Sequence, residues 1–260
     1  MLRPASLAGC SRHLDQPCLI IHPTASDRRL YSADQLGDDV VAVIDFLKLE
    51  KPVLVGHSFA GEELSSVATR HPEKVAGLVY LDAAYSYAYY DAARGDLMID
   101  SLEMQRKLEQ LQPGKGPRDL RPLIAELLQA LPQLEKDLQA REKSLPPAPG
   151  PASTQMPTPA VPAPIQAIIA GLKKYTAISV PVLAIYADPH DLRGVFRDDP
   201  EAQAKAEADD VIATEAQAKA FETGVPSSRV VRIANASHAV FKSDEAEVLR
   251  EMHAFIDRLP

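Results

Sequence analysis

Ser58 stands alone in the stretch VLVGHSFAGEEL, between an apolar run and a segment with helical character. A serine hydroxyl is a weak nucleophile, and it attacks a carbonyl carbon only where a neighbouring base takes its proton. His238, which ends the stretch SRVVRIANASH, is a candidate for that base. Asp188 and Asp191 follow the apolar run VPVLAIYA, and an aspartate can orient such a histidine. Together these residue types predict nucleophilic catalysis by a serine.

The elements that must position these residues alternate between strands and helices. Short apolar runs predict strands at 18–22, 52–57, 76–82, 180–186 and 229–233. Apolar residues at helical spacing predict a helix that begins at Ser32, helices over 62–70 and 200–222, and a closing helix. This alternation predicts a doubly wound, mostly parallel α/β sheet. Because chemistry gathers beyond the carboxyl ends of such strands, we expect Ser58 and His238 to meet there.

The middle of the chain has a different texture. Leucines at helical spacing predict helix within 92–178, interrupted at Pro122 and Pro132. The stretch 146–164 is so rich in proline that regular helix and sheet are excluded there. Because strand signals resume after it, we interpret this part as a helical insertion with a proline-rich loop. The chain therefore divides into 1–91, 92–178 and 179–260.

Three stretches of the chain resemble motifs of the α/β-hydrolase family. VGHSFAG is similar to the nucleophile elbow of that family, PVLAIYADPHD to the strand that carries the acid, and IANASHAVF to the histidine loop. The resemblance covers about residues 31–260, with serine, aspartate and histidine in the order that such hydrolases show. It implies an α/β-hydrolase fold in which 92–178 forms a helical cap. The first strands of that fold are expected to be missing, because little chain precedes Ser58.

The resemblance also implies a role for each candidate residue. Ser58 would be the nucleophile, and His238 the general base that takes and returns its proton. Asp191 is the expected acid, because it matches the family position at the end of its strand. Asp188, closer to that strand, and Asp82, at the end of the preceding strand, are the alternatives. No metal or cofactor is expected.

The small residues around Ser58 suit a tight strand-to-helix turn. Such a turn strains the backbone and crowds the neighbouring side chains, and Gly56, Ala60 and Gly61 relieve the crowding. The family pattern G-x-S-x-G is not fully matched, since Ala60 takes the place of its last glycine. The helix that follows directs free N–H groups toward the serine, and the N–H of Phe59 is the expected oxyanion donor.

Tyrosines gather where the strand 76–82 leads into the insertion. Aromatic rings with polar tips suit a pocket that holds an apolar substrate, and Tyr85 and Tyr87 are the candidates for substrate binding. Tyr89 and Tyr90 belong to the same cluster. Half-buried packing is the alternative interpretation.

Two functions are consistent with these patterns. The first is a serine carboxylesterase that acts on small apolar acyl esters through a Ser-His-Asp triad. The second is a catalytically weak or inactive α/β-hydrolase-like binding protein without a complete oxyanion hole. It is favoured by the lack of a His-Gly loop, from which the family takes a second oxyanion N–H. The stretch IIHP resembles that loop, but Pro23 has no N–H to donate.

Composition limits the classes of partner that the protein is expected to bind. The net charge of −8 and the lack of a basic patch argue against nucleic acid and anionic membrane surfaces. No apolar run reaches the roughly 18 residues of a membrane span, and the N-terminus lacks a signal-peptide core. Two cysteines, Cys10 and Cys18, make a disulfide framework unexpected. We expect a cytoplasmic enzyme with a small-molecule ester substrate, and an uncovered sheet edge makes a homodimer possible.

Overall fold

One parallel sheet organises the part of the chain that the computed structural model describes, which is residues 31–145, 162–193 and 200–259. Its strands lie in the order in which they occur along the chain, and all neighbours are parallel. They are β1 (Val53–His57), β2 (Gly77–Leu81), β3 (Val182–Ala187) and β4 (Ser228–Ile233). The runs expected at 52–57, 76–82, 180–186 and 229–233 correspond to these four. The run expected at 18–22 lies outside the described residues.

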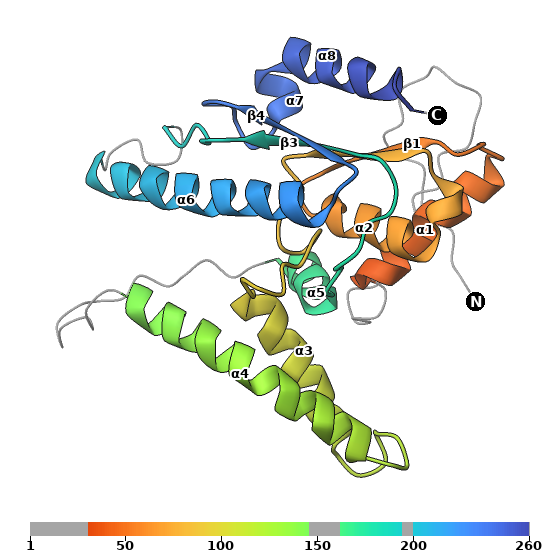
Figure 1. The fold of residues 1–260 in the computed structure, drawn as a ribbon, viewed down its shortest axis with the longest axis vertical. Coiled ribbons are helices and arrows are strands. Elements are labelled where there is room, and N and C mark those ends of the chain that lie inside the picture. The colour runs from red at the N-terminus through yellow and green to blue at the C-terminus, as the bar shows by residue number, and fades with distance from the viewer. Residues whose placement is uncertain (1–30, 146–161, 194–199, 260) are drawn as a thin grey trace, which may run out of the picture.

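The sheet is covered by helices on both faces (Figure 1). Every residue of β2 and β3 is buried, as their continuous apolar sequences predict for strands packed on both sides. Successive side chains point to opposite faces, so two separate cores form. Leu78, Tyr80 and Tyr186 belong to one core, whereas Val79 and Ile185 belong to the other.

The helices around the sheet begin and end where the sequence favours it. Ser32 caps the first helix by accepting a hydrogen bond from the backbone N–H of Gln35 at 3.3 Å, the expected capping interaction. In Figure 1, the first, second and sixth helices cover one face of the sheet and the last two cover the other. These helices are α1 (Ala33–Phe46), α2 (Ala60–Arg70), α6 (Pro200–Gly224), α7 (Val240–Ser243) and α8 (Glu245–Ile256), and a short 3-10 helix η2 spans Pro72–Lys74.

The insertion forms a helical arm that extends away from the sheet (Figure 1). It contains α3 (Leu97–Gln110) and α4 (Arg121–Ser144), which pack against each other, and α5 (Ala163–Gly171). Met104, Leu123 and Leu127 form a small core of their own between α3 and α4.

The expected interruptions of the leucine stripe need a correction. Helix α4 runs on through Pro132, although proline removes one backbone hydrogen bond. Pro122 lies in the first turn of α4, where no helical partner for its backbone nitrogen is needed. Neither proline therefore divides the helix.

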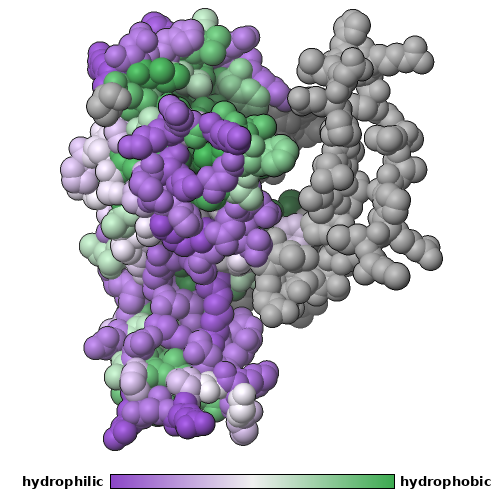
Figure 2. Space-filling model, turned by 90° about the vertical axis from the view of Figure 1, so that its right-hand side faces the viewer, coloured by the Kyte–Doolittle hydropathy of each residue, from purple (hydrophilic) through white to green (hydrophobic). Residues whose placement is uncertain are grey.

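Apolar surface remains exposed near the β1 edge of the sheet. Figure 2 shows apolar residues gathered over the sheet end of one face and, separately, at the far end of the arm. Val55 of β1 is 46% exposed and Phe46, at the end of α1, is 84% exposed. Within the described ranges β1 pairs with β2 alone, so association through this edge stays a prediction. No helix in those ranges combines the length and apolar character that a membrane crossing requires.

Candidate active site

Ser58 directly follows β1 and begins a sharp turn into α2. Its φ of 55° lies in the left-handed region, which costs energy for a residue with a side chain. The turn packs against the loop after β2: a Cβ on Gly61 would lie 2.0 Å from the carbonyl oxygen of Ala83. A Cβ on Gly56 would lie 3.1 Å from the Cβ of Ala60. The small residues around Ser58 are therefore needed for space.

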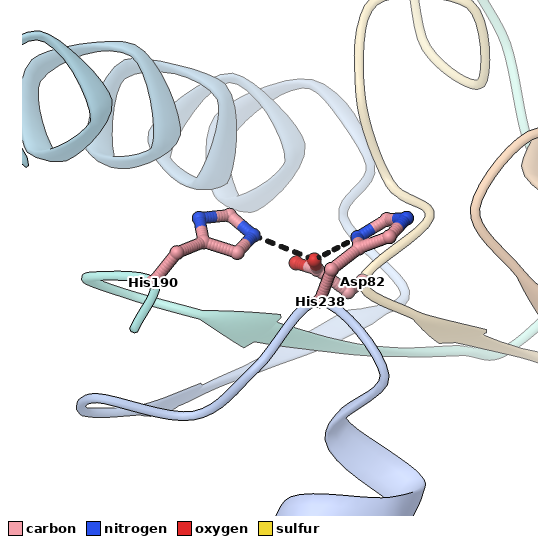
Figure 3. A group of neighbouring side chains, drawn as sticks. All are labelled: Asp82, His190 and His238. Atoms are coloured by element: carbon pink, nitrogen blue, oxygen red, sulfur yellow. Dashed lines mark hydrogen bonds and ion pairs between the residues drawn. The ribbon is translucent and has the colours of Figure 1, made fainter. Parts of the chain in front are cut away.

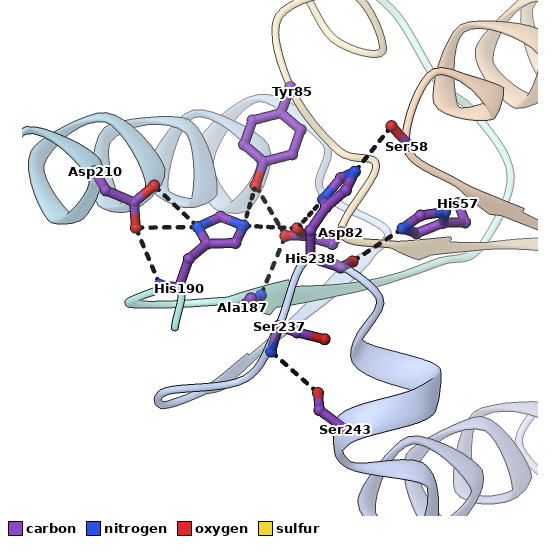
Figure 4. Close-up of polar contacts among 10 residues, drawn as sticks. All are labelled: His57, Ser58, Asp82, Tyr85, Ala187, His190, Asp210, Ser237, His238 and Ser243. Atoms are coloured by element: carbon purple, nitrogen blue, oxygen red, sulfur yellow. Dashed lines mark hydrogen bonds and ion pairs between the residues drawn. The ribbon is translucent and has the colours of Figure 1, made fainter. Parts of the chain in front are cut away.

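A continuous hydrogen-bonded chain links Ser58 to a buried carboxylate (Figure 4). The Oγ of Ser58 lies 3.0 Å from Nε2 of His238, and Nδ1 of His238 lies 2.6 Å from Oδ2 of Asp82. A carboxylate accepts, so Nδ1 of His238 carries the proton and its Nε2 is free to accept from the serine hydroxyl. A candidate nucleophile, a candidate base and a candidate acid are thus within reach of one another.

The acid contact differs from the one expected. Asp191 is directed to Arg193, whose Nε and Nη2 each lie 2.9 Å from its carboxylate oxygens. These hydrogen bonds lower the pKa of this half-buried carboxyl to about 2. Asp188 pairs instead with Arg232. The contact expected for Asp191 is therefore wrong, and Asp82, a weighed alternative, lies beside His238.

The surroundings of Asp82 hold it as a carboxylate. Its side chain is 0% exposed, and Oδ1 accepts hydrogen bonds from the Tyr85 hydroxyl at 2.8 Å and the Ala187 N–H at 3.1 Å. Oδ2 accepts from His238 and from Nε2 of His190, the latter at 2.7 Å. Burial alone would raise the pKa of Asp82, but its hydrogen bonds to the two histidines lower it to about 2. Asp82 is consequently ionised at neutral pH.

Two further residues of this network were not predicted as site residues. They are His190 and Asp210. Nδ1 of His190 lies 2.9 Å from one carboxylate oxygen of Asp210, and its backbone N–H donates to the other at 3.0 Å. Burial lowers the pKa of His190, but Asp82 and Asp210 raise it to about 9. Asp210 lies on a helix rich in acidic residues, so the sequence held no signal that distinguished it.

The three groups drawn in Figure 3 are close enough to be tested as a metal site. The ligand atoms of Asp82, His190 and His238 all lie within 4.8 Å of one another. The two nitrogen–oxygen distances of 2.6 and 2.7 Å, however, are hydrogen-bond lengths. Ligand atoms on a tetrahedral zinc ion are separated by roughly 3.3 Å. The spacing therefore fits shared protons and does not fit zinc.

The loop that carries His238 is fixed from two sides. Nε2 of His57 donates to the backbone carbonyl oxygen of His238 at 2.9 Å, and the two rings lie 4.6 Å apart between centroids. On the other side, the backbone N–H of Ser237 donates to the hydroxyl of Ser243 at 3.0 Å (Figure 4). His57 thus holds the loop of His238 in place, and its ring also packs against Phe241.

Phe59 directly precedes α2, at the helix end where backbone N–H groups lack helical partners. The first bonds of the turn run from Gly61 N–H to Ser58 and from Glu62 N–H to Phe59, both at 3.0 Å. The N–H of Phe59 precedes them and remains the candidate oxyanion donor. The stretch IIHP, which resembles the family's loop for a second donor, lies outside the described residues.

The two tyrosines expected to bind substrate occupy different positions. The Tyr85 hydroxyl is hydrogen-bonded to Asp82, so this residue supports the acid. The ring of Tyr87 packs against Phe59, with 5.2 Å between centroids, next to the nucleophile. Tyr87 is therefore the better placed of the two to contact a substrate.

A family profile and one short relative match the sequence. A sequence profile described as the Alpha/beta hydrolase family matches residues 2–251. A segment of 54 residues is 43% identical to 2-hydroxymuconate semialdehyde hydrolase of Pseudomonas sp. (strain CF600), covering 21% of this chain and 19% of that protein.

Solved structures resemble the fold. The esterase RhEst1 from Rhodococcus sp. ECU1013 is similar with a TM-score of 0.51 and 16% identity, over 92% of this chain and 76% of that one. An epoxide hydrolase of Bacillus megaterium gives a TM-score of 0.49 and 20% identity, over 90% and 78% of the chains. With the profile matching nearly the whole sequence, the chain belongs to the alpha/beta hydrolase family.

Proposed function

We propose that this protein is a serine hydrolase that cleaves carboxylic esters of small apolar acyl groups. The observation that carries the proposal is the unbroken chain from the Ser58 hydroxyl through His238 to Asp82. Ser58 is presented on a strained turn and is only half-buried, so a substrate can reach it. A serine that merely capped a helix would need neither the histidine nor the buried carboxylate.

Each residue then has a step in the reaction. Ser58 Oγ attacks the ester carbon while Nε2 of His238 takes the serine proton, and Asp82 stabilises the imidazolium that forms. The carbonyl oxygen becomes an oxyanion, which accepts a hydrogen bond from the N–H of Phe59. His238 returns the proton to the departing alcohol, and Ser58 keeps the acyl group. Water, activated by His238, then releases the acid.

The preference for an apolar acyl group rests on the residues beside Ser58. The rings of Phe59 and Tyr87 lie together next to the nucleophile. The Tyr87 hydroxyl has no hydrogen bond to another described residue, and burial raises its pKa well above the usual range, so the ring stays neutral. An apolar acyl chain against these rings would be removed from water, which is favourable.

The alternative function is a binding protein whose triad turns over little substrate. It is favoured by one consideration: the described residues include the loop of one expected oxyanion donor, Phe59, and not the stretch around Pro23 that resembles the loop of a second. Loss of one donor typically costs about 100- to 1,000-fold in turnover. A good leaving group lowers the same barrier, so a slow enzyme would cleave nitrophenyl acetate and hardly touch ethyl acetate.

Covalent labelling tests the proposal. A fluorophosphonate probe should label the wild-type protein at Ser58, and Ser58→Ala should abolish the labelling. Ser101→Ala removes an exposed serine of α3 and is the matched control, which should label normally. Equal labelling of Ser58→Ala would reject Ser58 as nucleophile. No labelling of the wild type, with no turnover of nitrophenyl acetate, would favour the binding protein.

A further inference from the structure

His190 lies between two carboxylates, and each of its ring nitrogens faces one of them. Nε2 lies 2.7 Å from Oδ2 of Asp82, and Nδ1 lies 2.9 Å from Oδ1 of Asp210 (Figure 4). A neutral imidazole carries one N–H and one lone pair, so one of these carboxylates would face a lone pair. Only the imidazolium donates to both. The geometry therefore calls for a doubly protonated ring.

We propose that His190 and Asp210 are positioning residues: a charged His190, anchored by Asp210, holds the Asp82 carboxylate in place for His238. Asp210, His190, Asp82, His238 and Ser58 then form one hydrogen-bonded chain, in which a positive His190 lies between the negative Asp210 and Asp82. The consequence for rate rests on the proposed hydrolase function, whereas the protonation state of His190 does not.

The groups around His190 favour its positive charge. Its side chain is 12% exposed, and a cavity of about 600 Å³ borders it. Arg193, which also lines that cavity, forms an ion pair with Asp191. The titratable groups that face His190 come from four elements: Asp82 and Tyr85 after β2, Asp210 and Glu207 on α6, His238 after β4, and Asp191 and Arg193 on its own loop. Acidic groups prevail among them, in keeping with the raised pKa of about 9 for His190.

A charge at His190 affects the base. His190 and His238 donate to the same oxygen of Asp82, and their rings lie 6.2 Å apart between centroids. A positive charge at this distance makes a second positive charge on His238 less favourable. His190 therefore acts, through the shared oxygen of Asp82, on the group proposed to accept the serine proton.

The protonation of His190 can be observed directly by NMR on the full chain with ¹⁵N-labelled histidine. One of the seven histidines should keep both ring protons above the ordinary titration near pH 6.5 and lose one only at about pH 9. His190→Gln should remove that signal, whereas His253→Gln, which changes an exposed histidine of α8, should leave it.

A second pair of variants tests the anchor. Asp210→Asn should move the titration of the same signal to lower pH, because it removes one of the two negative charges beside the ring. Asp209→Asn changes the preceding residue of α6, which pairs with Lys205, and should not move it. The proposal is overturned if all histidines titrate near pH 6.5, or if Asp210→Asn leaves the signal unchanged.

The effect on the base is measured by the rate of probe labelling against pH. In His190→Gln the new amide side chain would still offer a donor to Asp82 but no charge, so this variant separates the two contributions. The acid-side midpoint of its labelling rate should move up by about one pH unit. An unmoved midpoint in a folded variant would overturn the role in positioning. If the wild type does not label, the proposed hydrolase function fails, and the NMR titration alone decides the state of His190.

Discussion

Asp82 and Asp191 follow neighbouring parallel strands at the same edge of the sheet, yet they have opposite surroundings. Asp82 is fully buried, and its oxygens accept hydrogen bonds from two histidines, a tyrosine and a backbone N–H. Asp191 lies in a partly exposed loop and, among the side chains that the structure describes, is bound to Arg193 alone. Both carboxyl groups have a pKa lowered to about 2. A lowered pKa therefore does not distinguish the candidate acid from a carboxylate in an ion pair, whereas the contacts of the carboxylate do.

The path of each loop explains the difference. Asp82 is the first residue after β2, and its left-handed backbone, with φ of 46°, turns the chain at once. The loop after β3 continues for several residues before Asp191. It places His190 inward, where the backbone forms a bridge with Ala236. The position nearest His238 is consequently filled from β2, and the loop after β3 supplies a histidine in place of an acid.

The largest expected difference in turnover is between the variants of these two aspartates. Asp82→Asn should lower the turnover of nitrophenyl acetate by roughly 10,000-fold, because His238 loses both its tautomer control and its counter-charge. Asp191→Asn is the matched change on the next strand and should leave turnover within about twofold. A larger loss in Asp191→Asn than in Asp82→Asn would reverse the assignment of the acid.

The hydroxyl of Tyr85 should have a smaller effect on the same carboxylate. Tyr85→Phe removes one donor to Oδ1 of Asp82, and hydrogen bonds to charged groups contribute about 1.5–3 kcal/mol. We expect turnover to fall by about tenfold, since three donors remain. Tyr89→Phe is the control, because its ring packs on Phe221 in the core. Equal losses in both variants would show that the hydroxyl of Tyr85 has no special role.

Stability against acid should also distinguish the two aspartates. The pKa of Asp82 is about 2 when folded and near 4 when unfolded. Its contribution to the free energy of unfolding is therefore complete above about pH 4 and is lost as pH falls toward 2. In chemical denaturation, the free energy of unfolding should fall by about 2 kcal/mol less in Asp82→Asn than in the wild type as pH falls from 4 toward 2. Asp191→Asn should keep the wild-type slope, because an exposed ion pair is screened by water. Matching slopes in wild type and Asp82→Asn would contradict this.

His190 should give the opposite dependence at alkaline pH. Its pKa is raised to about 9 in the folded protein, so its contribution is complete below about pH 6.5 and lost as pH rises through 9. The wild type should lose stability over that range, and His190→Gln should lose less. Denaturant midpoints at several pH values measure the difference. Equal losses in both proteins would show that His190 is not charged in the folded state.

The smallest effect is expected at the partner of Asp191. Arg193→Ala releases that carboxylate without touching Asp82, and exposed ion pairs contribute about 0–1 kcal/mol. Turnover and the midpoint of unfolding should therefore stay close to those of the wild type. A strong loss of turnover would mean that the loop after β3 takes a direct part in the reaction.

Much of this arrangement was predictable from the sequence. Apolar runs located the four described strands, and the small residues around Ser58 identified the turn. The meeting of Ser58 and His238 followed from the parallel strands, whose carboxyl ends share one edge.

The choice of acid was not predictable in the same way. Asp82, Asp188 and Asp191 each follow a strand, and which of them faces His238 depends on the path of its loop. Asp210 was beyond sequence reasoning for a different reason. It comes from a long acidic helix on which its neighbour Asp209 binds a lysine in solvent. Only the packing of α6 beside the loop after β3 selects Asp210 for His190.

Site-specific labelling tests the central claim most directly. Wild type, Asp82→Asn and Asp191→Asn would each react with a fluorophosphonate probe at neutral pH, and mass spectrometry would follow the adduct on Ser58 over time. If Asp82 supports the base, the adduct should form rapidly in wild type and Asp191→Asn and far more slowly in Asp82→Asn. Rapid labelling of Asp82→Asn together with slow labelling of Asp191→Asn would contradict the account.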